Sequence, residues 1–551
     1  MSGSVVATAI EAACALAILG FAGRTRANPG AAPPQPAATN RHPARTSRAK
    51  VIAGCGLLAF ALNALMSLLN PPLPAIHDEF SYLLAADTFA HGRCANPPHP
   101  MAVHFETFHV IQWPTYASKY PPAQGLALAA GVLLAGRPIV GVWLGTALAA
   151  AAVAWMLCGW LPRRWAAFGG LLFVVQGILQ LSWGQGYWGG AIATLGGALL
   201  FGGWVRLMRA PRALASVLLA LGAAVLAASR PFEGFVACVP VAVTLAGRFL
   251  GGNRPAWRET LVQFLLPAGA VGAAAAGGML SYNACVTGSP WKLPYQVHEA
   301  AYGAAPVFVF QSKPPVPAYR HAVLRDFHTG WALEAYERQQ TLAGFMTEKA
   351  AAFLMLWWYF LRPTLTIPFC AALMRLGRRR PFRFAAGTLA LTLAAASTVT
   401  WLKPHYVAPV YPLIWLLTIQ GFRQLRAMPG RGERRGRGVV RGLVMLNIAV
   451  FVFEAALYVK TPQPEFARER ASIAARLEQT AGRHLVIVQY SPEHNPHAEW
   501  VYNAADIDAA KVVWARAIDA QHDARLIDYF QERRVWVLNA DLQPIALRES
   551  E

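Results

Sequence analysis

The chain has 551 residues and a formal net charge of +21, and 55% of its residues are hydrophobic whereas only 14% are charged. This composition excludes burial of all the apolar surface in one water-soluble core. Apolar runs of roughly 16 to 23 residues recur along the chain, which is the length that a helix needs to cross a bilayer. The short alternating segments of a β-barrel are not seen. We therefore expect an α-helical polytopic membrane protein.

The positive charge is distributed unevenly. Nearly all the dense arginine runs lie between apolar segments, including those at residues 375–383 and 423–441. This is the positive-inside pattern of cytoplasmic loops, so the charge indicates topology and membrane lipids as neighbours, and we expect no nucleic-acid partner.

The first 50 residues are predicted to anchor the chain and to link it to the rest. Residues 5–22 are apolar enough for a span, although they include Glu11, and no small-residue cleavage site follows them. We expect a retained anchor and not a signal peptide. Residues 24–50 are rich in Pro, Ala and Arg, which predicts a flexible cytoplasmic linker.

Residues 51–460 are predicted to form a transmembrane bundle, and about 12 to 13 spans are expected in the whole chain. The short apolar run 126–135 falls below the hydrocarbon thickness, so we expect a re-entrant or surface-lying helix there. Two long loops, residues 70–122 and 285–350, are placed on the outer side. Cys94 and Cys285 lie in these loops, which permits a disulfide between them without establishing one.

Residues 461–551 differ in composition, with evenly spread charges and three β-rich runs, HLVIVQY, KVVWARAI and RRVWVLNA. Helical or turn-like pieces separate the runs, which predicts a small α/β domain on the outer face. No glycine-rich phosphate loop accompanies these strands, so we expect no nucleotide site in this domain.

Loop 70–122 carries most of the concentrated polar chemistry. It has the adjacent carboxylates Asp78 and Glu79 just after an apolar helix, and it closes with Lys119 and Tyr120 before two prolines. An acid pair with a returning cation suits activation of a hydroxyl and neutralisation of an anionic leaving group. The alternative is a solvated helix cap and stop signal. The length and aromatic content of the loop disfavour a plain connector.

Further polar clusters follow other apolar segments on the same predicted side. They are His77 beside the acid pair, Arg230 and Glu233 in SRPFEG, and Lys403, His405 and Tyr406 in KPHY. If the helices form one bundle, these clusters converge and suit a lipid-phosphate substrate. The alternative for each cation is a helix-end anchor that reaches the headgroups. Arg230 runs against the positive-inside trend, which favours an ion pair or a ligand contact.

Two other motifs leave alternatives open. WGQGYWGG, residues 183–190, could line a sugar or prenyl site through Trp183 and Tyr187, or form an interfacial aromatic belt with a glycine-rich turn. His104 and His109 lack a convincing third ligand, so no metal site is assigned, and a divalent cation is the one cofactor left open.

The acidic pair after an early span, the long first outer loop with its Lys-Pro-Pro-like close, the many spans and the outer C-terminal domain resemble the GT-C superfamily of polyprenyl-phosphate-sugar-dependent glycosyltransferases. The similarity is greatest to the branch of protein O-mannosyltransferases and aminoarabinose transferases. It implies that Asp78 is the catalytic base, Glu79 a supporting carboxylate and Lys119 a contact to the donor phosphate.

We therefore expect a glycosyltransferase, inverting at the sugar carbon, that moves a sugar from a polyprenyl-phosphate carrier to a hydroxyl of a glycan, lipid or protein acceptor on the outer face of a bacterial-type inner membrane. The expected donor-phosphate contacts are Lys119, Tyr120, Arg230, Lys403 and His405, and the expected substrate contacts are His77, Glu233, Tyr406, Trp183 and Tyr187. One alternative is a polymerase or ligase that uses a pyrophosphate-linked oligosaccharide. The other is a transporter or flippase, which should carry ionisable residues at mid-membrane and often an internal repeat.

Overall fold

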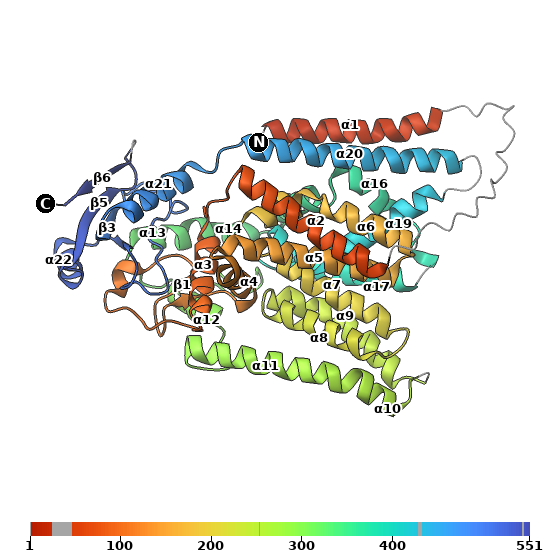
Figure 1. The fold of residues 1–551 in the computed structure, drawn as a ribbon, viewed down its shortest axis with the longest axis horizontal. Coiled ribbons are helices and arrows are strands. Elements are labelled where there is room, and N and C mark those ends of the chain that lie inside the picture. The colour runs from red at the N-terminus through yellow and green to blue at the C-terminus, as the bar shows by residue number, and fades with distance from the viewer. Residues whose placement is uncertain are drawn as a thin grey trace.

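The computed structural model describes residues 2–24, 47–252, 254–378, 380–427, 432–542 and 545–550. Helices run side by side along the long axis of the molecule, and a small C-terminal sheet lies at one end (Figure 1). The α-helical membrane fold class with a C-terminal α/β region is thus confirmed. Most of the expected linker, residues 24–50, falls outside the described residues, as do parts of the arginine-rich loops.

Five helical segments are long and apolar enough to cross a membrane: Arg48–Leu69 (α2), Pro138–Trp160 (α5), Pro231–Leu250 (α9), Trp257–Thr287 (α10, η4 and α11) and Arg435–Lys460 (within α20, Gly432–Lys460). Two bent pairs also qualify: Arg163–Val174 (α6) with Ile178–Gln185 (η2 and η3), and Leu342–Phe360 (α15) with Arg362–Leu373 (α16). The described residues thus give up to 7 such spans, fewer than expected from the sequence. One reason is that two apolar runs expected to span form shorter helices, namely α7 (Ala191–Leu207) and α8 (Ala213–Ala227), whereas the short run 126–135 forms the short helix α4 (Pro122–Ala135).

The helix α1 (Ser2–Arg24) lies beside α20, as Figure 1 shows. Its one acidic residue, Glu11, is buried and accepts a hydrogen bond from the backbone N–H of Thr364 at 3.1 Å and another from the Thr364 hydroxyl. A buried carboxylate needs such partners in an apolar bundle. This contact explains how Glu11 is accommodated within an apolar helix.

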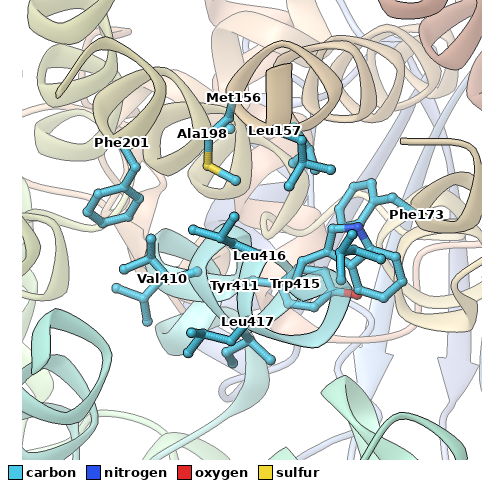
Figure 2. Packing of buried hydrophobic residues seen from close by; sticks show 14 of the residues in the cluster. Met156, Leu157, Phe173, Ala198, Phe201, Val410, Tyr411, Trp415, Leu416 and Leu417 are labelled. Carbon is cyan, nitrogen blue, oxygen red and sulfur yellow. The ribbon is translucent and has the colours of Figure 1, made fainter. Parts of the chain in front are cut away.

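The centre of the bundle is the largely buried helix α19 (Tyr411–Arg426). Figure 2 shows its side chains packed against residues of α5, α6 and α7, and the indole N–H of Trp415 donates to the Gly169 carbonyl at 2.9 Å. Close contact needs small residues: a Cβ at Gly197 would lie 1.9 Å from the Pro409 carbonyl oxygen. The helix α17 (Arg380–Ala396) packs beside α19 and α9.

Loop 70–122 folds into α3 (His77–Ala90), the turn η1 (Ala102–Phe105) and a two-stranded hairpin, β1 (Val110–Ile111) and β2 (Ala117–Ser118). Loop 285–350 contributes α12 (Pro294–Tyr302), α13 (Ala322–Arg325), η5 (Asp326–Ala332), α14 (Leu333–Glu337) and η6 (Arg338–Gln340). The disulfide that the sequence left open is formed: Cys94 bonds to Cys285, which joins the first loop to the end of α11. We call the part of the molecule that is formed by residues 70–122 and 285–350 the loop end.

The C-terminal region has α21 (Glu465–Gln479), β3 (Arg483–Gln489), β4 (Val512–Arg516), α22 (Ala520–Tyr529), β5 (Arg533–Asn539) and β6 (Ala546–Glu549). The sheet order is β4-β3-β5-β6, with β3 parallel to β4 and β5 and with β6 antiparallel. The three predicted strands are present, and β6 is additional. This region shares a core with the first loop, where the Phe80 and Tyr502 rings stack at 4.2 Å.

Candidate active site at the loop end

The two adjacent carboxylates occupy the first turn of α3 but have different surroundings. Glu79 is buried, and its oxygens accept hydrogen bonds from three backbone N–H groups: Ala75 at 2.9 Å, Ile76 at 3.3 Å and Tyr187 at 2.9 Å. Burial raises the pKa of the Glu79 carboxyl, and these N–H groups oppose the rise. Glu79 therefore caps α3 and fixes it to the turn of residues 183–190.

Asp78 is half-buried and accepts a hydrogen bond from the Tyr120 hydroxyl. Side-chain bonds hold the hairpin against α3: the Ser81 hydroxyl lies 2.6 Å from the His109 carbonyl oxygen and 2.7 Å from the Ser118 hydroxyl. The Ser118 hydroxyl in turn accepts from the Tyr120 backbone N–H at 3.2 Å. This arrangement places the close of the loop beside its first carboxylate, as the sequence predicted.

Four tyrosines surround Asp78. The ring of Tyr82 stacks on that of Tyr120 with centroids 4.5 Å apart. Burial raises the pKa of Tyr82, Tyr120, Tyr295 and Tyr406, with that of Tyr406 at about 12, and the Asp78 carboxylate contributes to each rise. These hydroxyls therefore stay protonated near neutral pH, and among them the Tyr120 hydroxyl donates to the half-exposed carboxylate.

Lys119 brings a cation to this cluster. Its side chain is buried, and its Nζ lies 3.5 Å from Glu299 Oε1 and 4.9 Å from the centre of the Tyr295 ring. Burial alone would raise the pKa of Glu299, but the Lys119 ammonium and the His298 imidazole outweigh it and lower this pKa to about 2. Lys119 is therefore held by a carboxylate of the second loop.

Arg230 provides a second cation from a third segment, at the N-cap of α9. Its guanidinium lies 4.7 Å from the centre of the Tyr406 ring. Glu233 is buried one turn later in α9. Arg230 and Tyr406, predicted from separate motifs, thus meet, and the Asp78 carboxylate contributes to the raised pKa of Tyr406.

The remaining predicted donor contacts lie at the margin. Lys403 is exposed, whereas His405 is buried with its ring 4.9 Å from that of Trp188. Burial, then the charges of Arg230 and Lys403, hold the pKa of His405 well below its usual range. His405 is therefore neutral and near the Arg230 end of the cluster.

Two predicted substrate contacts, Trp183 and Tyr187, have structural partners within the fold. Trp183 is 2% exposed and packs edge-on against Phe360 and Tyr411 in the bundle core. The Tyr187 hydroxyl donates to the Pro72 carbonyl at 3.4 Å, in addition to the backbone bond to Glu79. The sequence motif could not separate a binding surface from a packed turn, and the structure makes it a packed turn.

His77 likewise faces away from Asp78. Its ring stacks on Phe108 at 4.0 Å, and its Nε2 lies 2.9 Å from the Pro496 carbonyl oxygen in the C-terminal region. Burial lowers the pKa of His77 to about 4. Adjacent residues of a helix point about 100° apart, so His77 and Asp78 face different neighbours. The contact of His77 with Pro496 connects α3 to the C-terminal region.

The sequence analysis missed the contribution of α12. Tyr295, His298 and Glu299 lie on this helix, and their signal was the WKLPYQVHEAAYG segment, which stood out only as part of a long loop. His298 begins a group of rings that continues to His109 at 5.9 Å and to His328 at 6.1 Å. Buried ring nitrogens of all three lack hydrogen-bond partners.

No group of three or more His, Cys, Asp or Glu side chains is placed to hold a metal ion within the part of the chain that the structure describes. The Nδ1 atom of His104 lies 2.8 Å from the Arg516 carbonyl oxygen. The Glu79 carboxylate accepts hydrogen bonds from backbone N–H groups.

No family model and no curated protein sequence matches the chain. Solved structures with a similar fold include the oligosaccharyltransferase of Archaeoglobus fulgidus in complex with zinc and sulfate, with a TM-score of 0.52 and 12% identity over 89% of this chain and 67% of that one. ArnT from Cupriavidus metallidurans bound to undecaprenyl phosphate has a TM-score of 0.51 and 14% identity over 89% of this chain and 92% of that one. The chain therefore has the fold of the GT-C glycosyltransferases, as the resemblance predicted.

Proposed function

We propose that this protein is a membrane glycosyltransferase that moves a sugar from a polyprenyl-phosphate carrier to an acceptor hydroxyl with inversion at the sugar carbon. The observation that carries the proposal is the hydrogen bond from the Tyr120 hydroxyl to Asp78, with Lys119 next to Tyr120 in the chain and Arg230 packed on the ring of Tyr406, a tyrosine whose pKa the Asp78 carboxylate helps to raise. The fold likeness supports the class of reaction, because ArnT, with the same fold, was solved with undecaprenyl phosphate bound.

Asp78 acts as the general base. Its half-buried carboxylate accepts the proton of the acceptor hydroxyl while the acceptor oxygen forms a bond to the anomeric carbon. The bond from that carbon to the carrier phosphate breaks on the opposite face of the sugar, which inverts the configuration. The Tyr120 hydroxyl, which donates to Asp78, holds the carboxylate in place.

The cations hold the carrier. Lys119 and Arg230 neutralise the phosphate as it takes up negative charge, with the Tyr406 hydroxyl as a further donor. A phosphate leaves as a weakly basic anion, so no acid has to protonate it. Glu79 takes no proton in this scheme, because three backbone N–H groups occupy its oxygens.

We further propose that the loop end lies on the outer face of a bacterial-type inner membrane. The arginine-rich segments 375–383 and 423–441 support this orientation through the positive-inside rule. We assign residues 461–551 to the same face, where they contact α3 and influence acceptor choice without chemistry of their own.

The test is transfer by the purified full chain in lipid vesicles. Radiolabelled sugar on polyprenyl phosphate should be transferred by the native protein and not by Asp78→Asn. A donor linked through pyrophosphate should be a poor substrate. If only the pyrophosphate donor reacts, the protein is an oligosaccharide ligase, and if labelled lipid crosses the bilayer without transfer, it is a flippase. Mass spectrometry of envelope glycans with and without the protein then identifies the acceptor.

A further inference from the structure

A cavity of about 350 Å³ lies between α3, the turn from α4 to α5, and the C-terminal region. Its lining is mostly apolar and includes Leu83 and Leu84 of α3 and Val132 of α4, and Arg470 and Tyr502 close it from the C-terminal side. The volume falls at the lower end of the range for small-molecule sites, which is about 300 to 1,000 Å³.

The cavity is separate from the candidate active site. Along α3 it is lined by Phe80, Leu83, Leu84, Ala86 and Asp87. A helix turns about 100° per residue, so Asp87, nine residues after Asp78, lies about 180° from it around the helix axis. A ligand here would touch the opposite face of α3 from the one that presents Asp78.

One wall of the cavity carries a cation. Arg470 donates to the carbonyl oxygens of Trp500 at 3.2 Å and Tyr502 at 3.0 Å, and its guanidinium lies 4.7 Å from the centre of the Phe80 ring. No carboxylate among the described residues forms an ion pair with Arg470. An anionic group would therefore meet a guanidinium that has no direct ion pair among the described residues, and the buried Glu499 carboxylate acts on this guanidinium only through space.

The acidic group in the lining is already engaged. Asp87 accepts a hydrogen bond from the Ala505 backbone N–H at 2.7 Å, and its other oxygen lies 3.2 Å from His91 Nδ1. These contacts hold the Asp87 carboxylate against Ala505 and His91, and among the lining residues Asp87 is the one acidic side chain and Arg470 the one basic side chain.

The apolar wall continues onto a surface that suits lipid. Val132, in the lining, is followed on α4 by Leu133 and Leu134, which are 68% and 73% exposed. Exposed leucines on an apolar helix of a membrane protein match hydrocarbon and not water. A chain that lies along this face of α4 can pass into the cavity.

We propose that this cavity is a lipid site that takes one acyl chain of an anionic phospholipid of the surrounding membrane, with the headgroup phosphate at Arg470. The space suits part of one chain, and the cation selects an anionic headgroup over a zwitterionic one. Because the lipid packs against α3 and the C-terminal region together, its binding stabilises their contact.

The experiment uses the purified full chain in nanodiscs that contain phosphatidylglycerol with a photoactivatable diazirine on one acyl chain. Mapping of crosslinks by mass spectrometry should find peptides that contain residues 80–87 and 132–138. Leu83→Trp and Val132→Trp fill the cavity from two walls, and each should reduce the yield of these crosslinks severalfold. The matched control Leu214→Trp, at a leucine of α8 that is 69% exposed and is not among the lining residues, should leave them unchanged.

The headgroup is tested in two further arms. Phosphatidylcholine with the same diazirine chain should label these peptides less than phosphatidylglycerol does. Arg470→Gln, checked for a native melting profile, should raise the half-saturating phosphatidylglycerol concentration by about tenfold or more.

Three results overturn the proposal. They are labelling that both cavity-filling variants leave unchanged, equal labelling by the two headgroups, and labelling by a diazirine polyprenyl phosphate in place of the phospholipid. The last result makes the cavity a carrier site instead. None of these readouts requires transferase activity, so their failure is distinct from failure of the proposed function.

Discussion

The two faces of the α3 N-terminus differ in how fully their polar groups are hydrogen-bonded. On one face, Glu79 is buried and all its bonds come from backbone N–H groups that cannot move away. On the other, Asp78 is half-buried and its hydrogen bond comes from a side chain, the Tyr120 hydroxyl. Neighbours in sequence with the same chemistry thus have different roles: a saturated carboxylate supports the fold, and an accessible one can exchange a proton.

The residues around Glu79 and around Asp78 differ in the same way as the two carboxylates do. The Glu79 side continues into the packed turn of residues 183–190, where the Gln124 side-chain amide donates to the Tyr187 carbonyl at 2.8 Å. The Asp78 side opens onto tyrosine hydroxyls and two cations held by ring contacts and one ion pair. The second environment can accept a phosphate without loss of backbone bonds.

The largest effect is expected from Asp78→Asn. The change keeps the size of the side chain but removes the base, so turnover should fall by about 10² to 10⁴ while donor affinity stays near that of the native protein. Single-turnover transfer and equilibrium donor binding measure the two quantities. Asp326→Asn, which alters an exposed carboxylate of the second loop, is the control. Native turnover in Asp78→Asn would remove this residue from the mechanism.

Glu79→Gln should act on stability. The amide has one acceptor oxygen where the carboxylate has two, and its NH₂ group would face a backbone donor. Hydrogen bonds to a charged group contribute about 1.5 to 3 kcal/mol each, so the free energy of unfolding should fall by about 2 to 3 kcal/mol. Thermal unfolding in detergent measures the loss, and turnover per folded molecule should change little. A stable but inactive Glu79→Gln would exchange the roles of the two carboxylates.

Lys119→Ala tests the cation of the Asp78 side. Loss of a charged contact to the carrier phosphate should weaken donor binding by about 10- to 100-fold. Because this change also strands Glu299, the double variant Lys119→Ala with Glu299→Gln separates donor contact from burial of an unpaired carboxylate. Lys313→Ala, which breaks the exposed pair with Glu337, should leave binding unchanged. Donor binding that recovers in the double variant would make Lys119 a structural residue.

Much of this arrangement could be predicted from the sequence because membrane topology restricts where polar residues can gather. Asp78, Lys119 and Arg230 each adjoin an apolar segment, so one assumption about sidedness places them at the same end. The same assumption put Cys94 and Cys285 on one side, but only the fold gives their Cα separation of 6.4 Å, which allows a disulfide.

The parts that could not be predicted depend on tertiary packing. Glu299 lies 180 residues from Lys119 in sequence, and nothing local marks them as partners. Trp183 is in a glycine-rich aromatic turn that suits either a binding face or a core, and only burial distinguishes them.

The smallest effect per variant is expected on the pH dependence of stability, from substitution of the buried histidines His298 and His328. Burial lowers the pKa of His298 to about 4 and of His328 to about 3, from an ordinary value near 6.5. Between pH 6.5 and about 4 the unfolded chain therefore binds more protons than the folded one. The contribution of these neutral imidazoles to the free energy of unfolding should be complete above pH 6.5. It should fall as the pH decreases through this window, by at most about 1.4 kcal/mol per pH unit for each imidazole.

His298→Gln removes one of these imidazoles and keeps a neutral polar side chain. The melting temperature of this variant should therefore depend less steeply on pH between 6.5 and 4 than that of the native protein, with little difference above pH 7. His522→Gln, an exposed imidazole in α22, is the control and should reproduce the native slope more closely. A His298→Gln slope equal to the native one would mean that the histidine beside Glu299 is already protonated in the folded protein. The Lys119–Glu299 pair would then include a third charge, and the Asp78 side would be more positive than the present assignment requires.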